Sequence, residues 1–180
     1  MVIGPKKLLE LVKEVNLVSD LDKRELENPE GAGFDLRLGA VHKISGGAAF
    51  LGIHERETPT IETLYVFKKN EHQEIRIDPG DFYLLQTIEE VNLPKNITAQ
   101  ILPRTTTFRS GLIIRTGPVQ PGYQGSLTFA CFNAGPLPVV LELGCRFVHI
   151  QFFWIDGEGE MYRGQWQGGR VTTKKREKQV

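Results

Sequence analysis

Two arginines and three threonines stand close together between residues 102 and 125. This stretch reads LPRTTTFRSGLIIRTGPVQPGYQG and contains the run Arg104, Thr105, Thr106, Thr107 and Arg109. Arginine and threonine side chains give charge-assisted, directed hydrogen bonds to phosphate oxygens, so the run is a candidate phosphate-binding site. The alternative is an exposed turn whose arginines pair with carboxylates, and a short basic turn alone does not separate the two.

The segment from Tyr162 to Arg170 is a second candidate for ligand binding. It reads YRGQWQGGR, so its glycines let the backbone approach a ligand, its aromatic rings can stack and its cations can meet phosphate. The alternative is a disordered tail, and the basic residues 174–178 beyond it are expected to be disordered. We therefore expect a domain of residues 1–157 followed by a C-terminal arm and basic tail of residues 158–180.

The composition narrows the class of protein. With 180 residues, of which 40% are hydrophobic, the chain can bury one sizeable core. Its 22 basic and 22 acidic residues cancel, which argues against nucleic acid or a membrane as a partner but allows a local basic pocket. Because no apolar run is long enough to span a bilayer and no signal-peptide core is present, we expect a cytoplasmic protein.

Cysteine and histidine form no metal-binding pattern in this sequence. Cys131 and Cys145 lie in apolar segments without C-x-x-C spacing, so buried free thiols are expected. The four histidines are scattered, and no H-x-E precedes a P-C-x-x-C, the signature with which zinc deaminases hold their metal. We therefore expect no zinc and no metal held by the protein itself.

Hydrophobic periodicity predicts one helix and many short strands. Apolar side chains recur at helical spacing from Pro5 to Val18. Asp35 lies in a stretch of alternating apolar and polar residues bounded by glycines, which is typical of a strand. There its side chain either faces solvent or supports a neighbouring cation. Further strands are expected at 75–78, 82–88, 97–102, 126–132, 139–143 and 146–155. Short strands joined by glycine- and proline-rich turns indicate an all-β barrel or sandwich with one N-terminal helix.

Six segments, taken in order, resemble the motifs of the dUTPase and dCTP deaminase superfamily. They are GAGFDLRL from Gly31, PRTTTFRSGL from Pro103, GPVQPGYQG from Gly117, FNAG from Phe132, GCRFVHI from Gly144 and the glycine-rich tail. The N-terminal helix and tail are similar to those of dCTP deaminases, and the spacing from Arg109 to Gln120 is similar to that of dUTPases. The resemblance implies a mainly β subunit of the dUTPase-like β-barrel or β-clip type with a flexible C-terminal arm. It also implies a homotrimer that binds a deoxypyrimidine nucleoside triphosphate at subunit interfaces, with Mg²⁺ carried on the triphosphate.

The resemblance also implies roles for individual residues. Arg104, Thr105, Thr106 and Arg109 would contact phosphates, with Thr107 in the same run. The 117–123 hairpin would hold the edge of the pyrimidine with its backbone, and Tyr123 would pack on the sugar and exclude a 2′-hydroxyl. The tail would close over the nucleotide. The remaining members of the expected substrate-binding set are Gln120, Thr128, Ala130, Tyr162, Gln165 and Gln167, and Gln120 and Arg109 are the candidate catalytic residues.

The sequence departs from the superfamily pattern where general bases are expected. Gln120 stands in place of an Asp that activates water in dUTPases, and an amide cannot take that proton. Ala130 stands in place of a deaminase Glu, and a Glu introduced there would enter the apolar run 127–132, where we expect it to destabilise the fold. His149 replaces a usual Gln, and Gln165 and Gly169 correspond to a Lys and a Gln in the tail.

Three hypotheses for the function follow. The first is an enzyme that releases pyrophosphate from dUTP or ammonia from dCTP, with a base from elsewhere, such as Asp35, His149 or a neighbouring subunit. The second is a nucleotide-binding homologue that senses or buffers deoxynucleotides without turnover. The third is a structural or protein-binding barrel in which the Arg and Thr run is incidental.

Overall fold

The computed structural model describes residues 1–157 and 159–179, and strands dominate this part of the chain. The helices are α1 (Pro5–Val15), α2 (Lys23–Glu27) and α3 (Thr105–Arg109). The strands are β1 (Val18–Ser19), β2 (Phe34–Gly46), β3 (Phe50–Leu51), β4 (Glu55–Glu57), β5 (Thr60–Val66), β6 (Glu74–Ile77), β7 (Phe82–Asn92), β8 (Ile97–Pro103), β9 (Leu112–Arg115), β10 (Pro118–Val119), β11 (Gln124–Asn133), β12 (Val139–Glu142), β13 (Arg146–Trp154) and β14 (Glu177–Lys178). The prediction of a mainly β fold is confirmed.

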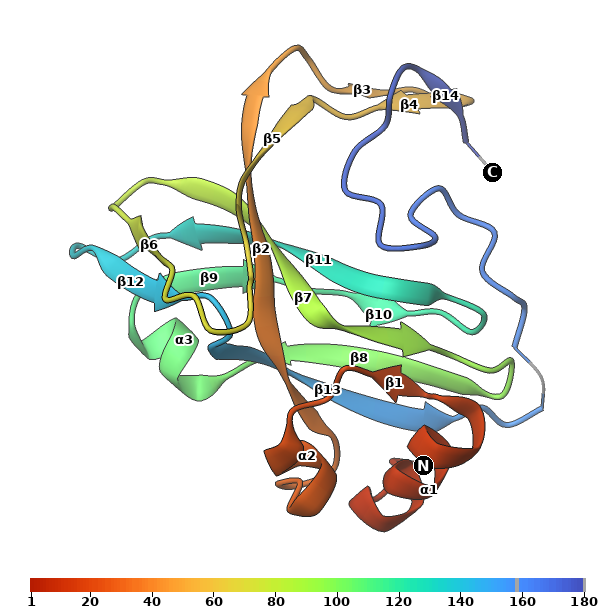
Figure 1. Cartoon of the computed structure of the whole chain (residues 1–180). Helices are drawn as coiled ribbons and strands as arrows, with labels where there is room; N and C mark the ends of the chain where they lie inside the picture. The colour runs from red at the N-terminus through yellow and green to blue at the C-terminus, as the bar shows by residue number, and fades with distance from the viewer. Residues whose placement is uncertain (158, 180) are drawn as a thin grey trace.

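One curled antiparallel sheet organises the molecule. Its strand order is β10-β8-β13-β2-β7-β11-β9, with β1 added to β7 and β5 added to β2. Strand β2 runs through the length of the molecule and belongs to both halves of the sheet (Figure 1). Its residues 34–37 pair with β13 and its residues 38–42 pair with β7. The sheet therefore turns over on itself at β2.

The core lies between the two halves of this curled sheet. Strand β11 buries Leu127, Phe129 and Cys131, while the alternate residues point to the other face. Phe129 meets Phe147 of β13 with ring centroids 6.0 Å apart, which places the two halves face to face. Burial of such side chains supplies the main stabilisation, roughly 1.5–3 kcal/mol for each large apolar group. Cys131 and Cys145 are both free thiols, as expected, with Cys131 buried and Cys145 partly buried.

The helices differ from the expectation in number and length. Helix α1 begins at Pro5, as predicted, but ends at Val15 because Asn16 adopts a left-handed conformation with φ of 52°. Helices α2 and α3, of 5 residues each, are not apparent from periodicity because neither completes two turns. Helix α2 begins where the side chain of Asp22 accepts a hydrogen bond from the backbone N–H of Arg24 at 2.9 Å.

The C-terminal segment crosses the sheet and ends beside β3 and β4 (Figure 1). The expectation that residues 174–178 are disordered is wrong, because Glu177–Lys178 form β14 and pair with β4. The predicted boundary between residues 157 and 158 includes Glu158, which lies outside the described residues, so the two-part division stays a prediction. Among residues 1–157 and 159–179, no helix is both long and apolar enough to span a membrane.

Candidate functional site

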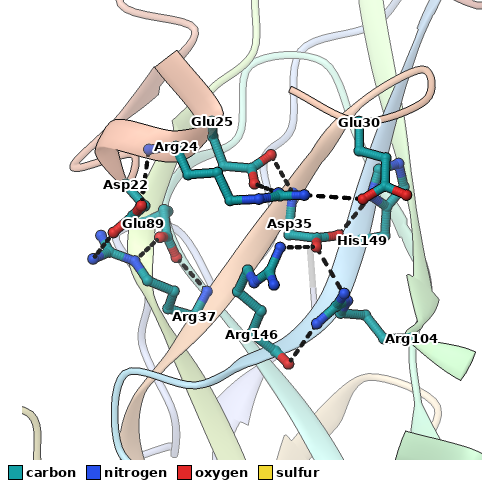
Figure 2. Close-up of polar contacts among 10 residues, drawn as sticks. All are labelled: Asp22, Arg24, Glu25, Glu30, Asp35, Arg37, Glu89, Arg104, Arg146 and His149. Atoms are coloured by element: carbon teal, nitrogen blue, oxygen red, sulfur yellow. Dashed lines mark hydrogen bonds and ion pairs between the residues drawn. The ribbon is translucent and has the colours of Figure 1, made fainter. Parts of the chain in front are cut away.

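Asp35 is the centre of a charged cluster formed by three strands. It lies on β2, opposite His149 of β13, and the two side chains are 2.9 Å apart between Oδ1 and Nδ1. Arg146 begins β13 and Arg104 directly follows β8, and one nitrogen of each lies 3.1 Å from Asp35 Oδ2 (Figure 2). Of the two alternatives for Asp35, the support of neighbouring cations is therefore confirmed.

Burial and the neighbouring charges shift the pKa of Asp35 in opposite directions. The residue is 6% exposed, and burial alone would raise the pKa of its carboxyl. The hydrogen bond with His149 and the charges of Arg104 and Arg146 lower it further than burial raises it, so the pKa falls below its ordinary value. Asp35 is thus an ionised carboxylate that holds two arginines in fixed positions.

A second buried carboxylate anchors β2 to β7. Glu89 is fully buried and accepts from Arg37 Nε at 2.6 Å and from the backbone N–H of Arg37 at 2.7 Å (Figure 2). Burial raises the pKa of Glu89 and outweighs the hydrogen bonds from Arg37, which lower it. On the other side of the Asp35 cluster, Glu25 of α2 accepts from the backbone N–H of Asp35 at 3.1 Å. The strand that carries Asp35 is therefore tied on both sides.

Helix α3 presents most of the predicted phosphate-binding run to solvent. Thr105, Thr106 and Arg109 are exposed, and Arg109 has no ion-pair partner among the residues that the structure describes. Thr107 is different, because it is 8% exposed and its hydroxyl donates to the backbone carbonyl of Phe147 at 3.1 Å. The Thr107 hydroxyl therefore fastens α3 to β13.

A pocket of about 500 Å³ lies at the other end of the sheet, beside β10 and the start of β11. Four of the predicted substrate-binding residues line it, namely Gln120, Tyr123, Thr128 and Tyr162. The rest of the lining is Thr58, Leu84, Arg115, Gly117, Pro118, Val119, Leu127, Phe129, Trp166, Arg170 and Val171. Most of these side chains are apolar or aromatic, so the pocket suits a flat ring.

Two tyrosines form one wall of the pocket. Tyr123 and Tyr162 pack edge to face with ring centroids 5.4 Å apart, and the Tyr123 hydroxyl donates to the backbone carbonyl of Ser126 at 2.7 Å. Burial raises the pKa of Tyr123 to about 12, so this ring stays neutral. Among residues 1–157 and 159–179, no carboxylate lines the pocket. The pocket can therefore stack and donate hydrogen bonds, but it offers no acidic side chain as a general base.

The C-terminal segment covers part of this pocket through contacts with the sheet. Gln167 donates from Nε2 to the carbonyl of Gly122 at 2.9 Å, and the N–H of Gly168 donates to the carbonyl of Gln124 at 2.8 Å. A Cβ at Gly125 would lie 2.5 Å from the nitrogen of Gly169, so only glycine lets the two backbones approach this closely. Contacts within the chain thus hold this segment against the sheet.

The structure separates the predicted residues into two groups. Helix α3 lies at the left end of the sheet and the hairpin between β10 and β11 lies at the right end (Figure 1). Of the remaining predicted residues, Gln165 donates to Glu177 at 2.7 Å, and Ala130 stands on β11 as the cross-strand partner of Arg115. Within one chain, therefore, the run 104–109 does not meet the pocket.

Sequence reasoning missed several residues of these two regions. Arg115, Trp166 and Arg170 line the pocket, and Arg146 belongs to the Asp35 cluster. Trp166 and Arg170 lie within the segment that had been proposed for ligand binding, so a signal existed for them. Arg115 and Arg146 each stand at one end of a strand, and strand pairing alone decides what faces them.

Similarity to known proteins identifies the family of this chain. A family model described as dCTP deaminase-like matches residues 3–155. A dCTP deaminase of Pyrobaculum calidifontis is 33% identical over 141 residues, which is 78% of this chain and 78% of that relative. A probable deoxyuridine 5'-triphosphate nucleotidohydrolase of Methanothermobacter thermautotrophicus is 32% identical over 146 residues, covering 81% of this chain and 91% of that relative.

A solved structure supports the fold. The 2'-deoxycytidine 5'-triphosphate deaminase from Agrobacterium tumefaciens superposes with a TM-score of 0.61 at 19% identity over 84% of this chain. This chain spans 47% of that protein's chain, about half its length. The resemblance drawn from the six sequence segments is thus confirmed, and the chain belongs to the dCTP deaminase-like family.

Proposed function

We propose that this protein binds a deoxypyrimidine nucleoside triphosphate, dUTP or dCTP, and acts in deoxypyrimidine nucleotide metabolism as a hydrolase of the dCTP deaminase or dUTP diphosphatase type. The observation that carries the proposal is the aromatic pocket beside the 117–123 hairpin, lined by Gln120, Tyr123, Thr128 and Tyr162. In this proposal, the hairpin backbone holds the base edge and Tyr123 packs on the sugar.

The two-ended arrangement supports a site shared between copies of the chain. Helix α3, which ends at Arg109 and directly follows Arg104, lies at the opposite end of the sheet from the hairpin between β10 and β11 (Figure 1). In this proposal, the pocket and the Arg104 and Arg109 end of one chain therefore do not bind the same nucleotide. In the homotrimer that we propose, the pocket of one copy faces the Arg104 and Arg109 end of another.

Asp35 has a positioning role in this proposal. Its carboxylate holds the Arg104 guanidinium at 3.1 Å and so fixes a long, flexible cation before phosphate arrives. Both carboxylate oxygens are engaged by Arg104, Arg146 and His149, so Asp35 does not fit the role of a Mg²⁺ ligand. Among the described residues, no group of three or more His, Cys, Asp or Glu could hold a metal ion. In this proposal, Mg²⁺ is carried by the phosphates of the nucleotide.

A second candidate function is supported by the chemistry of the pocket. Gln120 lines the pocket where a water-activating Asp is expected from the resemblance, and no described residue of the lining is a carboxylate. An amide cannot accept a proton at neutral pH, so a general base is missing from this part of the site. The alternative is therefore a nucleotide-binding homologue that senses or buffers deoxynucleotides without turnover.

One assay separates the two candidates. The purified full chain is incubated with Mg²⁺ and either dUTP or dCTP, and pyrophosphate and ammonia are followed separately. Release of either product above a control without protein identifies the reaction. Tight binding of a triphosphate with no release of either product favours the non-catalytic homologue. Absence of binding to both triphosphates overturns the proposed function.

A further inference from the structure

Arg115 is a cation in the pocket that the structure leaves without a partner. It ends β9, its side chain is exposed, and it lines the pocket. No hydrogen bond or ion pair joins it to any residue in the described part of the chain. The other arginine of the lining, Arg170, is instead held by Glu177, with Nη1 and Oε2 3.0 Å apart. Arg115 is therefore free to meet a ligand.

The strand register explains why Arg115 is unpaired. Its cross-strand partner on β11 is Ala130, and directly opposed residues of an antiparallel pair point to the same face of the sheet. The methyl side chain of alanine cannot accept a hydrogen bond, so the Arg115 guanidinium has no acidic partner directly opposite it on β11. Ala130 is in turn opposite Leu84 of β7, which also lines the pocket. Arg115 and Leu84 thus line the pocket on either side of Ala130.

A second polar group of the pocket lining, the hydroxyl of Thr128, also has no hydrogen-bond partner among the described residues. Thr128 lies two residues from Ala130 on the same face of β11 and lines the pocket. Its hydroxyl oxygen is buried and forms no hydrogen bond. Buried polar atoms are nearly always paired, so this hydroxyl indicates that a polar ligand edge completes the site.

This inference rests on the proposed function. If the pocket binds the base of a nucleotide, its unpaired polar groups determine which pyrimidine ring fits. A guanidinium has five N–H donors and no acceptor. Uracil and thymine carry a carbonyl oxygen at position 4, which accepts, whereas cytosine carries an amino group there, which donates. We propose that Arg115 makes this pocket select deoxynucleotides of the 4-keto pyrimidines, uracil and thymine, over those of cytosine. With cytosine the amino group would face the guanidinium, so a donor would meet a donor.

The test compares three ligands and needs no turnover. The α,β-imido analogues of dUTP, dTTP and dCTP, with Mg²⁺, are titrated calorimetrically into the full chain. We expect the cytosine analogue to bind about ten- to a hundredfold more weakly than the uracil analogue, because the cytosine amino group would oppose the donors of Arg115 and leave them unpaired. Equal affinity for the uracil and cytosine analogues overturns the inference and leaves the proposed function standing. Binding of none of the three overturns both.

Variants assign the preference to Arg115. Arg115→Gln should bring the ratio of the two affinities close to one, because an amide both donates and accepts, and Arg115→Glu should reverse it. Arg109→Gln removes the same charge outside the pocket and should weaken all three analogues together. A preference for uracil that survives Arg115→Gln assigns the selection to other groups and overturns the role of Arg115.

A further variant keeps Arg115 in place. Ala130→Glu sets a carboxylate opposite the guanidinium, and we expect the ratio to fall because Arg115 is then engaged by that carboxylate. Thermal unfolding of each variant shows that it is folded. If Arg115 instead contacts phosphate, Arg115→Gln weakens the three analogues equally and leaves binding of deoxyuridine unchanged, which also overturns the inference.

Discussion

The Asp35 cluster and the pocket beside β11 hold their arginines in opposite ways. In the cluster, Arg104 and Arg146 share one buried, ionised carboxylate, each with a nitrogen 3.1 Å from the same oxygen. In the pocket, Arg115 faces Ala130 and has no acidic neighbour in the lining. An arginine held by a carboxylate has a fixed position before any ligand binds. An unpaired arginine can donate its hydrogen bonds to an acceptor on a ligand. In the function that we propose, the two ends of the sheet bind different parts of a nucleotide.

The comparison also separates the two buried carboxylates. Asp35 has three cationic or hydrogen-bonding neighbours and its pKa is lowered, whereas Glu89 is fully buried beside Arg37 alone and its pKa is raised. Burial favours the neutral form in both cases; it outweighs the single cation beside Glu89, but not the three neighbours of Asp35 together. Asp35 belongs with the charged, partly accessible end of the molecule, and Glu89 belongs with the interior.

The largest effect is expected from placing a carboxylate in the pocket. Gln120→Asp should raise dUTP hydrolysis, because a group able to orient and deprotonate water then lines the pocket, and general base catalysis contributes about 10²–10⁴-fold. Pyrophosphate release measures the gain. Gln124→Asp makes the same change at an exposed position outside the lining and should have no effect. If the natural protein already hydrolyses dUTP rapidly and Gln120→Asp changes nothing, Gln120 does not occupy the base position.

Removal of the cations at the other end should have the next largest effect. Arg104→Ala and Arg109→Ala should each weaken binding of a deoxypyrimidine triphosphate about ten- to a hundredfold, and binding of the nucleoside far less, because an arginine–phosphate contact is charge-assisted. Calorimetric titration with both ligands checks this. Arg76→Ala removes an exposed arginine that pairs with Asp78 and should leave both affinities unchanged. Equal losses for nucleoside and triphosphate would remove Arg104 and Arg109 from the phosphate site.

Asp35→Asn should lower the free energy of unfolding by about 1–3 kcal/mol at pH 7, because two arginines lose their shared carboxylate. The folded-state pKa of Asp35 is lowered from 3.8, so the unfolded chain binds the proton more tightly than the folded chain. The ionised carboxylate therefore stabilises the fold fully above about pH 4, and this contribution is lost as the pH falls through the lowered pKa.

Urea unfolding of the natural protein and of Asp35→Asn, compared between pH 7 and pH 3, measures this difference. Asp78→Asn is the matched control, because Asp78 also pairs with an arginine but is 54% exposed, and such surface pairs contribute only about 0–1 kcal/mol. A difference between Asp35→Asn and the natural protein that grows as the pH falls would contradict the stated pKa direction.

The smallest effect is expected from Ala130→Glu. The apolar run 127–132 predicts that this change destabilises the protein, but Ala130 is only partly buried and lies opposite Arg115. We expect a change of less than about 1 kcal/mol in the free energy of unfolding, because a cross-strand ion pair contributes about 0.2–1 kcal/mol. Dependence of this change on Arg115, measured with the double variant Arg115→Ala/Ala130→Glu, checks the pairing. Hydrolysis of dUTP should not increase.

Local sequence pattern alone determined a large part of the fold. The helix that begins at Pro5, the strand after Gly31 and the strands of the 97–102 and 146–155 segments all follow from apolar periodicity and from turn residues. The pocket residues Gln120 and Tyr123 were predicted from the resemblance of the segment GPVQPGYQG to a family motif, and Tyr162 was predicted because it lies in a short segment rich in glycine and aromatic residues. Patterns of this kind extend over a few neighbouring residues, so they can be recognised without knowledge of the tertiary structure.

Tertiary structure alone decided which side chains meet. Asp35 joins Arg146 and His149 across 111 and 114 residues of sequence, and only the pairing of β2 with β13 brings them together. In the same way, the register of β9 against β11 sets Arg115 opposite Ala130. A slip of one residue in either pairing would turn these side chains to the other face of the sheet. Register depends on the burial of whole strands, so residue types alone could not predict the paired cluster or the unpaired arginine.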